Sequence, residues 1–146
     1  MNKEGITVAG NLIADVVYTI DVYPQKGNLT RMRNPVVHTG GINNLIIDLA
    51  RLDSKIPIKV SGVVGDDENG QFIVDSLREY PNINIEGIVK KGRTAVTFAM
   101  TEKESKQRTF FFDPGTSLEF NEKQIDFKKI KADIFHLEYL LLLGTL

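Results

Sequence analysis

The chain has 146 residues, of which 42% are hydrophobic and 25% charged, the balance of a globular domain with a core of its own. Its formal net charge of −1 provides no overall field that would attract nucleic acid or an anionic membrane. Because the sequence contains no cysteine, disulfides, thiolate metal sites and thiol catalysis are excluded. Met1–Gly5 lacks an apolar leader and the longest apolar run, Tyr139–Leu143, is too short to cross a bilayer, so we expect a cytoplasmic protein.

The first forty residues predict one buried strand and an exposed pair of strands. Ile6–Gly10 is short, apolar and ends on glycine, as the first strand of an α/β sheet does. Asp15–Asp21 alternates apolar and polar residues, which indicates a half-exposed strand. After turn residues at Pro24–Asn28, a second exposed strand is predicted over Thr30–His38. Because this pair does not follow a β–α alternation, we expect a small flap beside the main sheet.

The rest of the chain predicts alternating strands and helices. Gly40-Gly41 opens a helix from Ile42 to about Asp53, with apolar residues at helical spacing. Pro57–Val64 is typical of a buried strand, and Asp67 is placed to cap a second helix. The remaining predicted elements are strands at Ile83–Val89, Ala95–Thr101 and Arg108–Phe112 and a short helix at Asn121–Lys131. This order predicts an α/β domain with a mostly parallel sheet.

The end of the sequence is unusual for a natural terminus. Ile134–Leu143 has the composition of a buried strand that runs into more apolar chain, and the polypeptide stops three residues later. Natural termini usually lie in polar, solvated stretches. We therefore expect a truncated domain.

Two segments have some features of nucleotide-binding motifs but lack the decisive ones. Gly87–Thr94 has the glycine spacing of a phosphate loop, yet Arg93 replaces the lysine and a strand follows where a helix is needed. Gly10–Asp15 follows a first strand but carries one of the three glycines of a dinucleotide fingerprint. An NAD-binding domain is therefore discounted.

The titratable residues outside these segments have structural explanations. His38 and His136 are far apart in the sequence, and neither is spaced with another metal ligand, so we expect structural roles. The run Asp66–Glu68 is compatible with a cation site, but capping of the following helix explains it with fewer assumptions. No metal site is predicted.

The glycine pair before the first helix is a candidate binding corner. Gly40-Gly41 lets a ligand approach the main chain closely, and Asn43-Asn44 adds amide side chains at the positive end of a helix. The N–H groups of the first helical turn are unpaired donors. Such a corner suits sugar hydroxyl groups or a phosphate. The alternative is an ordinary glycine-rich loop that leads into a helix.

The sequence as a whole resembles the ribokinase-like (PfkB-type) carbohydrate kinases. Gly40–Leu52 and Val63–Gly70 resemble the first signature of that family, and the resemblance continues through Gly92–Thr94, Arg108–Phe111 and His136–Leu143. It implies a doubly wound, mostly parallel α/β sheet with a small β-sheet lid. Residues 1–146 are then the amino-terminal part of one ribokinase-like kinase domain, with lid strands at about 15–38 and the carboxy-terminal ATP-binding and catalytic half absent.

The resemblance also implies substrate-binding residues. Asp15 matches an aspartate that binds sugar hydroxyl groups, a task that suits a carboxylate because it accepts two neighbouring O–H bonds. Gly40, Gly41 and Asn44 match the glycine pair and a sugar-contacting asparagine. Glu138 matches a glutamate at a strand end near the substrate. Gly65–Gly70, in contrast, matches a structural turn into a helix.

The implied reaction is transfer of the ATP γ-phosphoryl group to a hydroxymethyl group of a sugar or nucleoside, with Mg²⁺. In the family, the catalytic base and the anion hole come from a Gly-Ala-Gly-Asp motif in the carboxy-terminal half, which also supplies the nucleotide pocket, and this motif does not occur here. We therefore expect no catalytic residue and no ATP or metal binding in this chain, which is predicted to be inactive alone. A homodimer through the lid strands is expected. The alternative is a non-catalytic sugar-binding or dimerisation domain of the same fold.

Overall fold

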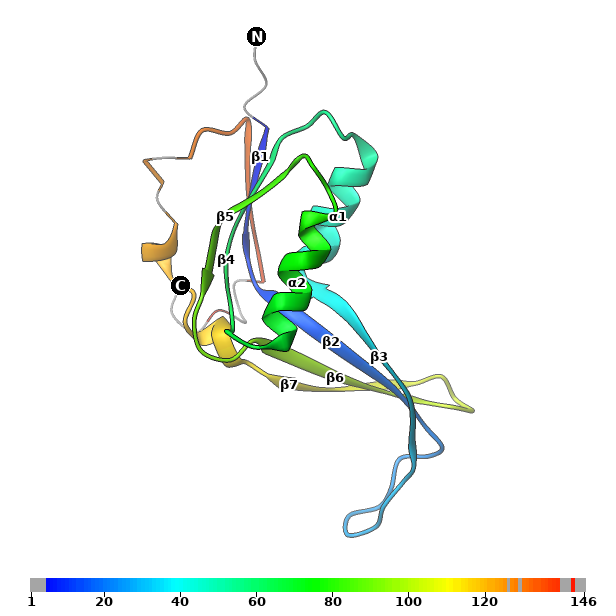
Figure 1. Ribbon diagram of the computed structural model, residues 1–146. Coiled ribbons are helices and arrows are strands. Elements are labelled where there is room, and N and C mark those ends of the chain that lie inside the picture. Colours follow the sequence, from blue (N-terminus) through cyan, green and yellow to red (C-terminus); the bar gives the residue numbers. More distant parts are fainter. Residues whose placement is uncertain (1–4, 126, 129, 140–142, 144–146) are drawn as a thin grey trace.

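The computed structural model describes residues 5–125, 127–128, 130–139 and 143. It contains two four-stranded sheets, which Figure 1 shows meeting where β1 passes into β2. The main sheet has the strand order β5-β4-β1-β8, and all its neighbouring strands are parallel. Its strands are β1 (Ile6–Gly10), β4 (Ile58–Val64), β5 (Ile83–Lys90) and β8 (Ile134–Glu138).

The second sheet projects from the end of the main sheet (Figure 1). Its strand order is β3-β2-β6-β7, in which β2 and β6 are parallel and the two outer pairs are antiparallel. Its strands are β2 (Leu12–Ile20), β3 (Met32–Gly41), β6 (Ala95–Glu102) and β7 (Arg108–Asp113). The predicted flap is therefore half of a larger sheet, because β2 pairs along its whole length with β6 from much later in the chain.

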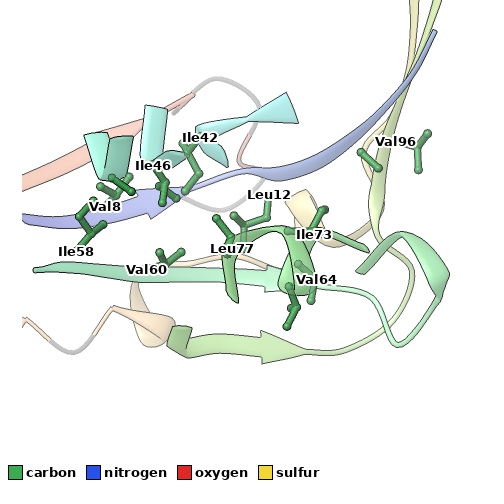
Figure 2. Packing of buried hydrophobic residues seen from close by; sticks show 13 residues of the cluster. Val8, Leu12, Ile42, Ile46, Ile58, Val60, Val64, Ile73, Leu77 and Val96 are labelled. Carbon is green, nitrogen blue, oxygen red and sulfur yellow. The ribbon is translucent and has the colours of Figure 1, made fainter. Parts of the chain in front are cut away.

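Two helices cover one face of the main sheet, α1 (Ile42–Leu52) and α2 (Glu68–Arg78) (Figure 1). Figure 2 shows Val8 and Val60 of the sheet packed against Ile46 of α1 and Leu77 of α2. The other face carries a smaller cluster made by these buried side chains: Ala9, Val63, Phe120, Ile125 and Leu143. Successive residues of a strand point to opposite faces, so β1 and β4 contribute buried side chains to both faces of the sheet, whereas the residues of β5 and β8 are exposed or only partly buried.

Among the described residues of the range Asn121–Lys131, the predicted helix is reduced to the short 3₁₀ turn η2 (Glu122–Gln124), which Asn121 caps. A second 3₁₀ turn, η1, spans Gly115–Leu118. Residues 126, 129 and 140–142 lie outside the described residues, so the end of the predicted terminal strand is not covered. Within the described part of the chain, no helix is long and apolar enough to span a membrane.

A hydrogen-bonded junction formed by Gly65, Asp67, Gly70 and Thr94 ties the two sheets together. Asp67 caps α2 by accepting a hydrogen bond from the Gly70 amide at 2.8 Å. Its other oxygen accepts from the Thr94 amide at 2.8 Å, and the Thr94 hydroxyl donates to Asp67 while it accepts from the Gly65 amide. Because Gly65 follows β4 and Thr94 precedes β6, this junction, which we call the Asp67 junction, fixes the second sheet to the main one.

The charge of Asp67 is stabilised inside this junction. Burial raises the pKa of the Asp67 carboxyl group. The pKa is lowered by hydrogen bonds from the Thr94 hydroxyl and from the Gly70 and Thr94 amides, and by the positive charge of Arg93. The net pKa lies below its ordinary value. The folded state therefore favours the ionised carboxylate. The capping role that the sequence predicts for Asp67 is confirmed.

We expect Asp67→Ala to lower the free energy of unfolding by about 2–3 kcal/mol, because it removes a helix cap and leaves the Thr94 amide unpaired. The contribution of a carboxyl group with a lowered pKa is complete above its unfolded value, about 3.9, and is lost as the pH falls through the folded pKa. Asp67→Asn keeps a capping oxygen but not the charge. Its free energy of unfolding should therefore fall further below that of the unchanged chain at pH 7 than below pH 3. Urea unfolding at both pH values measures this, and equal stability of Asp67→Ala and the unchanged chain would contradict the junction.

We also expect the 146-residue chain to self-associate through β8. In the described part of the chain β8 pairs with β1 alone, and Ile134 at its start is 56% exposed. Uncovered apolar edge strands promote association, and a lysine there opposes it. Ile134→Lys should shift sedimentation toward smaller species, whereas Leu52→Lys, a matched change at an exposed position of α1, should not. A monodisperse, cooperatively melting monomer of the unchanged chain would count against this expectation.

Candidate functional site

Asp15 lies in the middle of a row of side chains that crosses the second sheet. It pairs with His38 of β3 and with Thr97 of β6, and Thr97 pairs in turn with Phe112 of β7. Residues directly opposite each other in neighbouring strands point to the same face. One face of the second sheet therefore presents, in order, His38, Asp15, Thr97 and Phe112.

The surroundings of Asp15 disfavour its charge. Burial raises the pKa of its half-buried carboxyl group above the ordinary value, although a hydrogen bond from the Thr97 hydroxyl and the nearby His38 act in the opposite direction. A carboxylate held in this way lowers the stability of the fold at neutral pH. Groups with such perturbed pKa values cluster at functional sites.

Gly40 makes room for the Asp15 carboxylate. A Cβ atom at residue 40 would lie 2.5 Å from the Cγ atom of Asp15, closer than side chains approach in folded proteins. The Asn43 amide, which is fully buried, donates to the Gly40 carbonyl at 2.9 Å and holds the main chain in place. The close approach of Asp15 to bare backbone is thus built into the chain and requires glycine here.

Gly41 is the residue from which α1 begins. Its φ of 60° lies in the left-handed region, and a Cβ atom would collide with the carbonyl oxygen of Asn11. That carbonyl accepts a hydrogen bond from the Ile42 amide at 3.0 Å. As the N-cap, Gly41 makes no side-chain capping bond, so bare main chain marks this end of the helix.

Asp15 and Gly41 border one cavity of about 510 Å³. This is the size of a small-molecule site. The cavity lies where the second sheet meets the carboxyl ends of the main-sheet strands, because Tyr139, which directly follows β8, also borders it. The lining residues are Ile13, Asp15, Gly41, Thr97, Phe110, Phe112 and Tyr139.

Two residues singled out from the sequence, Asn44 and Glu138, are not among the lining residues of this cavity. Asn44 is exposed in the first turn of α1, where its side-chain oxygen accepts from the Thr39 hydroxyl at 3.3 Å. Glu138 ends β8 opposite Gly10, and its carboxylate lies 3.2 Å from the His136 ring. The structure thus brings Asp15, Gly40 and Gly41 together, whereas it shows no contact of Asn44 or Glu138 with Asp15 or with the cavity.

Five lining residues were not singled out as site residues from the sequence: Ile13, Thr97, Phe110, Phe112 and Tyr139. The alternation within Ala95–Thr101 and Arg108–Phe112 places Phe110 and Phe112 on one side of their strand. That signal alone does not connect them with Asp15, because the pairing of β2 with β6 joins segments about eighty residues apart.

The Gly87–Thr94 segment does not form a phosphate loop. It leads into the strand β6, and the Arg93 guanidinium forms an ion pair with Asp113, with one bond of 3.0 Å. No helix N-terminus follows to bind a phosphate. The structure confirms the discounting of this motif.

Comparison with known proteins identifies the fold. The model of the pfkB family carbohydrate kinases matches residues 3–146. A ribokinase from Thermotoga maritima superposes with a TM-score of 0.79 and 20% identity, over 90% of this chain and 43% of its own. A nucleoside kinase from Methanocaldococcus jannaschii, a member of the ribokinase family, superposes with a TM-score of 0.76 and 18% identity, over 92% of this chain and 44% of its own. Arabidopsis thaliana ribokinase complexed with ribose and ATP superposes with a TM-score of 0.67 and 18% identity, over 79% of this chain and 37% of its own.

The chain therefore spans less than half the length of these structures and has their ribokinase-like fold. A search of curated protein sequences found no match. The predicted architecture, a parallel α/β sheet accompanied by a second sheet, is confirmed.

We expect the contact between Gly40 and Asp15 to appear as an energetic coupling. Gly40→Ala should destabilise the chain by about 1–3 kcal/mol, because the new methyl group overlaps the carboxyl group. In an Asp15→Ala background the obstacle is gone, so the same change should cost at least about 1 kcal/mol less. Denaturant unfolding of the two single variants and the double variant measures the coupling. Strictly additive effects would show that the two residues do not touch.

Proposed function

The chain belongs to the PfkB family of carbohydrate kinases, and from this premise we propose that it is the substrate-binding part of a kinase for a sugar or a nucleoside. Residues 1–146 are, in this proposal, the amino-terminal part of one ribokinase-like domain, in which residues 15–38 supply lid strands. The whole enzyme transfers the γ-phosphoryl group of ATP to a hydroxymethyl group of the substrate.

The observation that carries this proposal is the corner shared by Asp15 and Gly41. A carboxylate next to bare main chain offers strong acceptors to two neighbouring hydroxyl groups, and main-chain groups lie within reach of the same ligand. A polyol is the ligand class that needs this combination. Asn44 and Glu138 are proposed as further substrate contacts, since Asn44 accepts a hydrogen bond from Thr39, the neighbour of Gly40, and Glu138 directly precedes the lining residue Tyr139.

The raised pKa of Asp15 supports a binding role. Hydroxyl groups that donate to the carboxylate replace the water it has lost, so the substrate favours the charged form that the free site disfavours. Because Asp15 accepts from the substrate and is already held by Thr97, its proposed role is to orient the sugar. We assign it no proton transfer.

We propose ATP and Mg²⁺ as cofactors of the whole enzyme, since the Arabidopsis ribokinase is complexed with ribose and ATP. In this proposal the described residues of this chain hold neither of them. No three His, Asp or Glu side chains among them come together as metal ligands, and the Gly87–Thr94 segment lacks the helix that a phosphate loop needs. The proposed contribution of this chain is to bind and position the substrate.

The opposite face of the second sheet supports a proposed homodimer. Val37, Phe98 and Phe111 are exposed there, on the side away from Asp15. Apolar side chains gathered on one surface indicate a protein contact. The same surface favours the second candidate function, a non-catalytic sugar-binding or dimerisation domain. In that case a longer protein that contains this chain would have no kinase activity.

The proposal is tested by separating binding from catalysis. With Mg-ATP and a panel of sugars and nucleosides, the 146-residue chain should give no phosphoryl transfer, and it should bind at least one compound of the panel. Asp15→Asn should weaken that binding about 10- to 100-fold, because a hydrogen bond to a charged acceptor is lost. Asp21→Asn, a change in an exposed aspartate just beyond β2, is the matched control and should bind normally.

Two outcomes would contradict the proposal. Turnover by this chain that Asp15→Ala abolishes would show that it contains catalytic groups. Binding that Asp15→Asn leaves unchanged would separate the substrate site from the Asp15 corner.

A further inference from the structure

The cavity beside Asp15 is bordered mainly by aromatic and aliphatic side chains. Phe110 and Phe112 of β7 border it together with Ile13 and Tyr139. Phe110 is 60% exposed and Phe112 37% exposed, although burial of an aromatic ring is strongly favourable. Two neighbouring rings that remain uncovered inside a cavity provide a surface for a flat, apolar group of a ligand.

The register of the second sheet sets the distance between the carboxylate and these rings. Asp15 is opposite Thr97, and Thr97 is opposite Phe112, so the three side chains share one face. Two inter-strand spacings, about 10 Å, separate the main chains of Asp15 and Phe112. A pentose bound to Asp15 is too short to cover Phe112 as well. A ligand that reaches both carries a second ring system attached to the sugar.

The polar groups of the cavity are also few for a free monosaccharide. Among the lining residues they are the Asp15 carboxylate, the Thr97 hydroxyl that already donates to it, the Gly41 main chain and Tyr139, and neither Asn44 nor Glu138 lines the cavity. A free sugar has a hydroxyl group on nearly every carbon. Each one placed against Phe112 loses its hydrogen bonds to water without replacement, which disfavours binding.

Tyr139 adds a geometric observation. Its φ of 61° lies in the left-handed region that few residues other than glycine adopt. Residues held in such conformations cluster at ligand sites. Because Tyr139 directly follows Glu138, the last residue of β8, the main sheet and the second sheet both supply an aromatic ring to the same cavity.

From these observations we propose that the ligand of this cavity is a nucleoside, a ribose joined to a planar heterocyclic base. The ribose hydroxyl groups bind to Asp15 and the Gly41 main chain, and the base stacks on Phe110 and Phe112. The inference rests on the proposed function, because it assigns the substrate class of the same site. Stacking suits every base, since each has a π face, so the geometry selects nucleosides over free sugars and no particular base.

Calorimetric titration of the 146-residue chain with adenosine, ribose and adenine tests the assignment. Adenosine should bind about tenfold or more tightly than either of its parts, and Phe112→Leu should weaken adenosine about tenfold while ribose changes less than about twofold. Phe111→Leu is the matched control, because Phe111 is the next residue of the same strand and points to the other face. Thermal unfolding verifies that each variant folds, and Phe110→Leu replaces Phe112→Leu if the latter does not.

The outcomes separate this inference from the proposed function. Ribose that binds as tightly as adenosine, with no effect of Phe112→Leu, would overturn the nucleoside assignment and leave the sugar site standing. Adenine that binds as tightly as adenosine, with no effect of Asp15→Asn, would reveal an apolar surface without a sugar site and would overturn both. Failure of all three compounds to bind would also overturn both.

Discussion

The close contact between the Asp15 carboxylate and the bare main chain of Gly40 is the constraint around which the site is arranged. It requires a residue without a side chain at position 40, and it leaves a half-buried carboxylate whose charge the fold disfavours. Neither feature helps the chain to fold. In the proposed function, a ligand with hydroxyl groups supplies the hydrogen bonds that Asp15 lacks, which would explain both features.

The rest of the architecture brings the two sides of this site together. The Asp67 junction fixes the start of β6 to the end of β4, and β6 carries Thr97 to its place beside Asp15. The cavity then opens where the parallel strands of the main sheet end at their carboxyl side, the usual position of ligands in open α/β sheets. Asp15 and Asp67 have opposite electrostatic characters: the junction favours the charge of Asp67, and the site disfavours that of Asp15.

Much of the fold was predictable from local patterns in the sequence. The strand at Ile6–Gly10, the helix after Gly41 and the cap at Asp67 follow from residues close in the chain and are present as expected. The four-stranded second sheet was not, because alternation within a strand does not say which strand it pairs with. The predicted helix at Asn121–Lys131 shortened to the single turn η2, since 3₁₀ and α segments have the same local signals. Asp15 and the glycine pair were predicted from the sequence as site residues. That Thr97 and Phe112 share a face with Asp15 becomes visible only from the strand register of β2 with β6 and of β6 with β7.

The most direct test of the account is the pKa of Asp15, measured by carbon-13 NMR of its carboxyl group with and without adenosine. Asp21, whose pKa is lowered by its hydrogen bond with Arg33, is an internal reference outside the cavity. The account predicts a pKa for Asp15 above about 3.9 in the free chain and a fall when the nucleoside binds, while Asp21 does not respond. An ordinary pKa for Asp15 that adenosine leaves unchanged would contradict it.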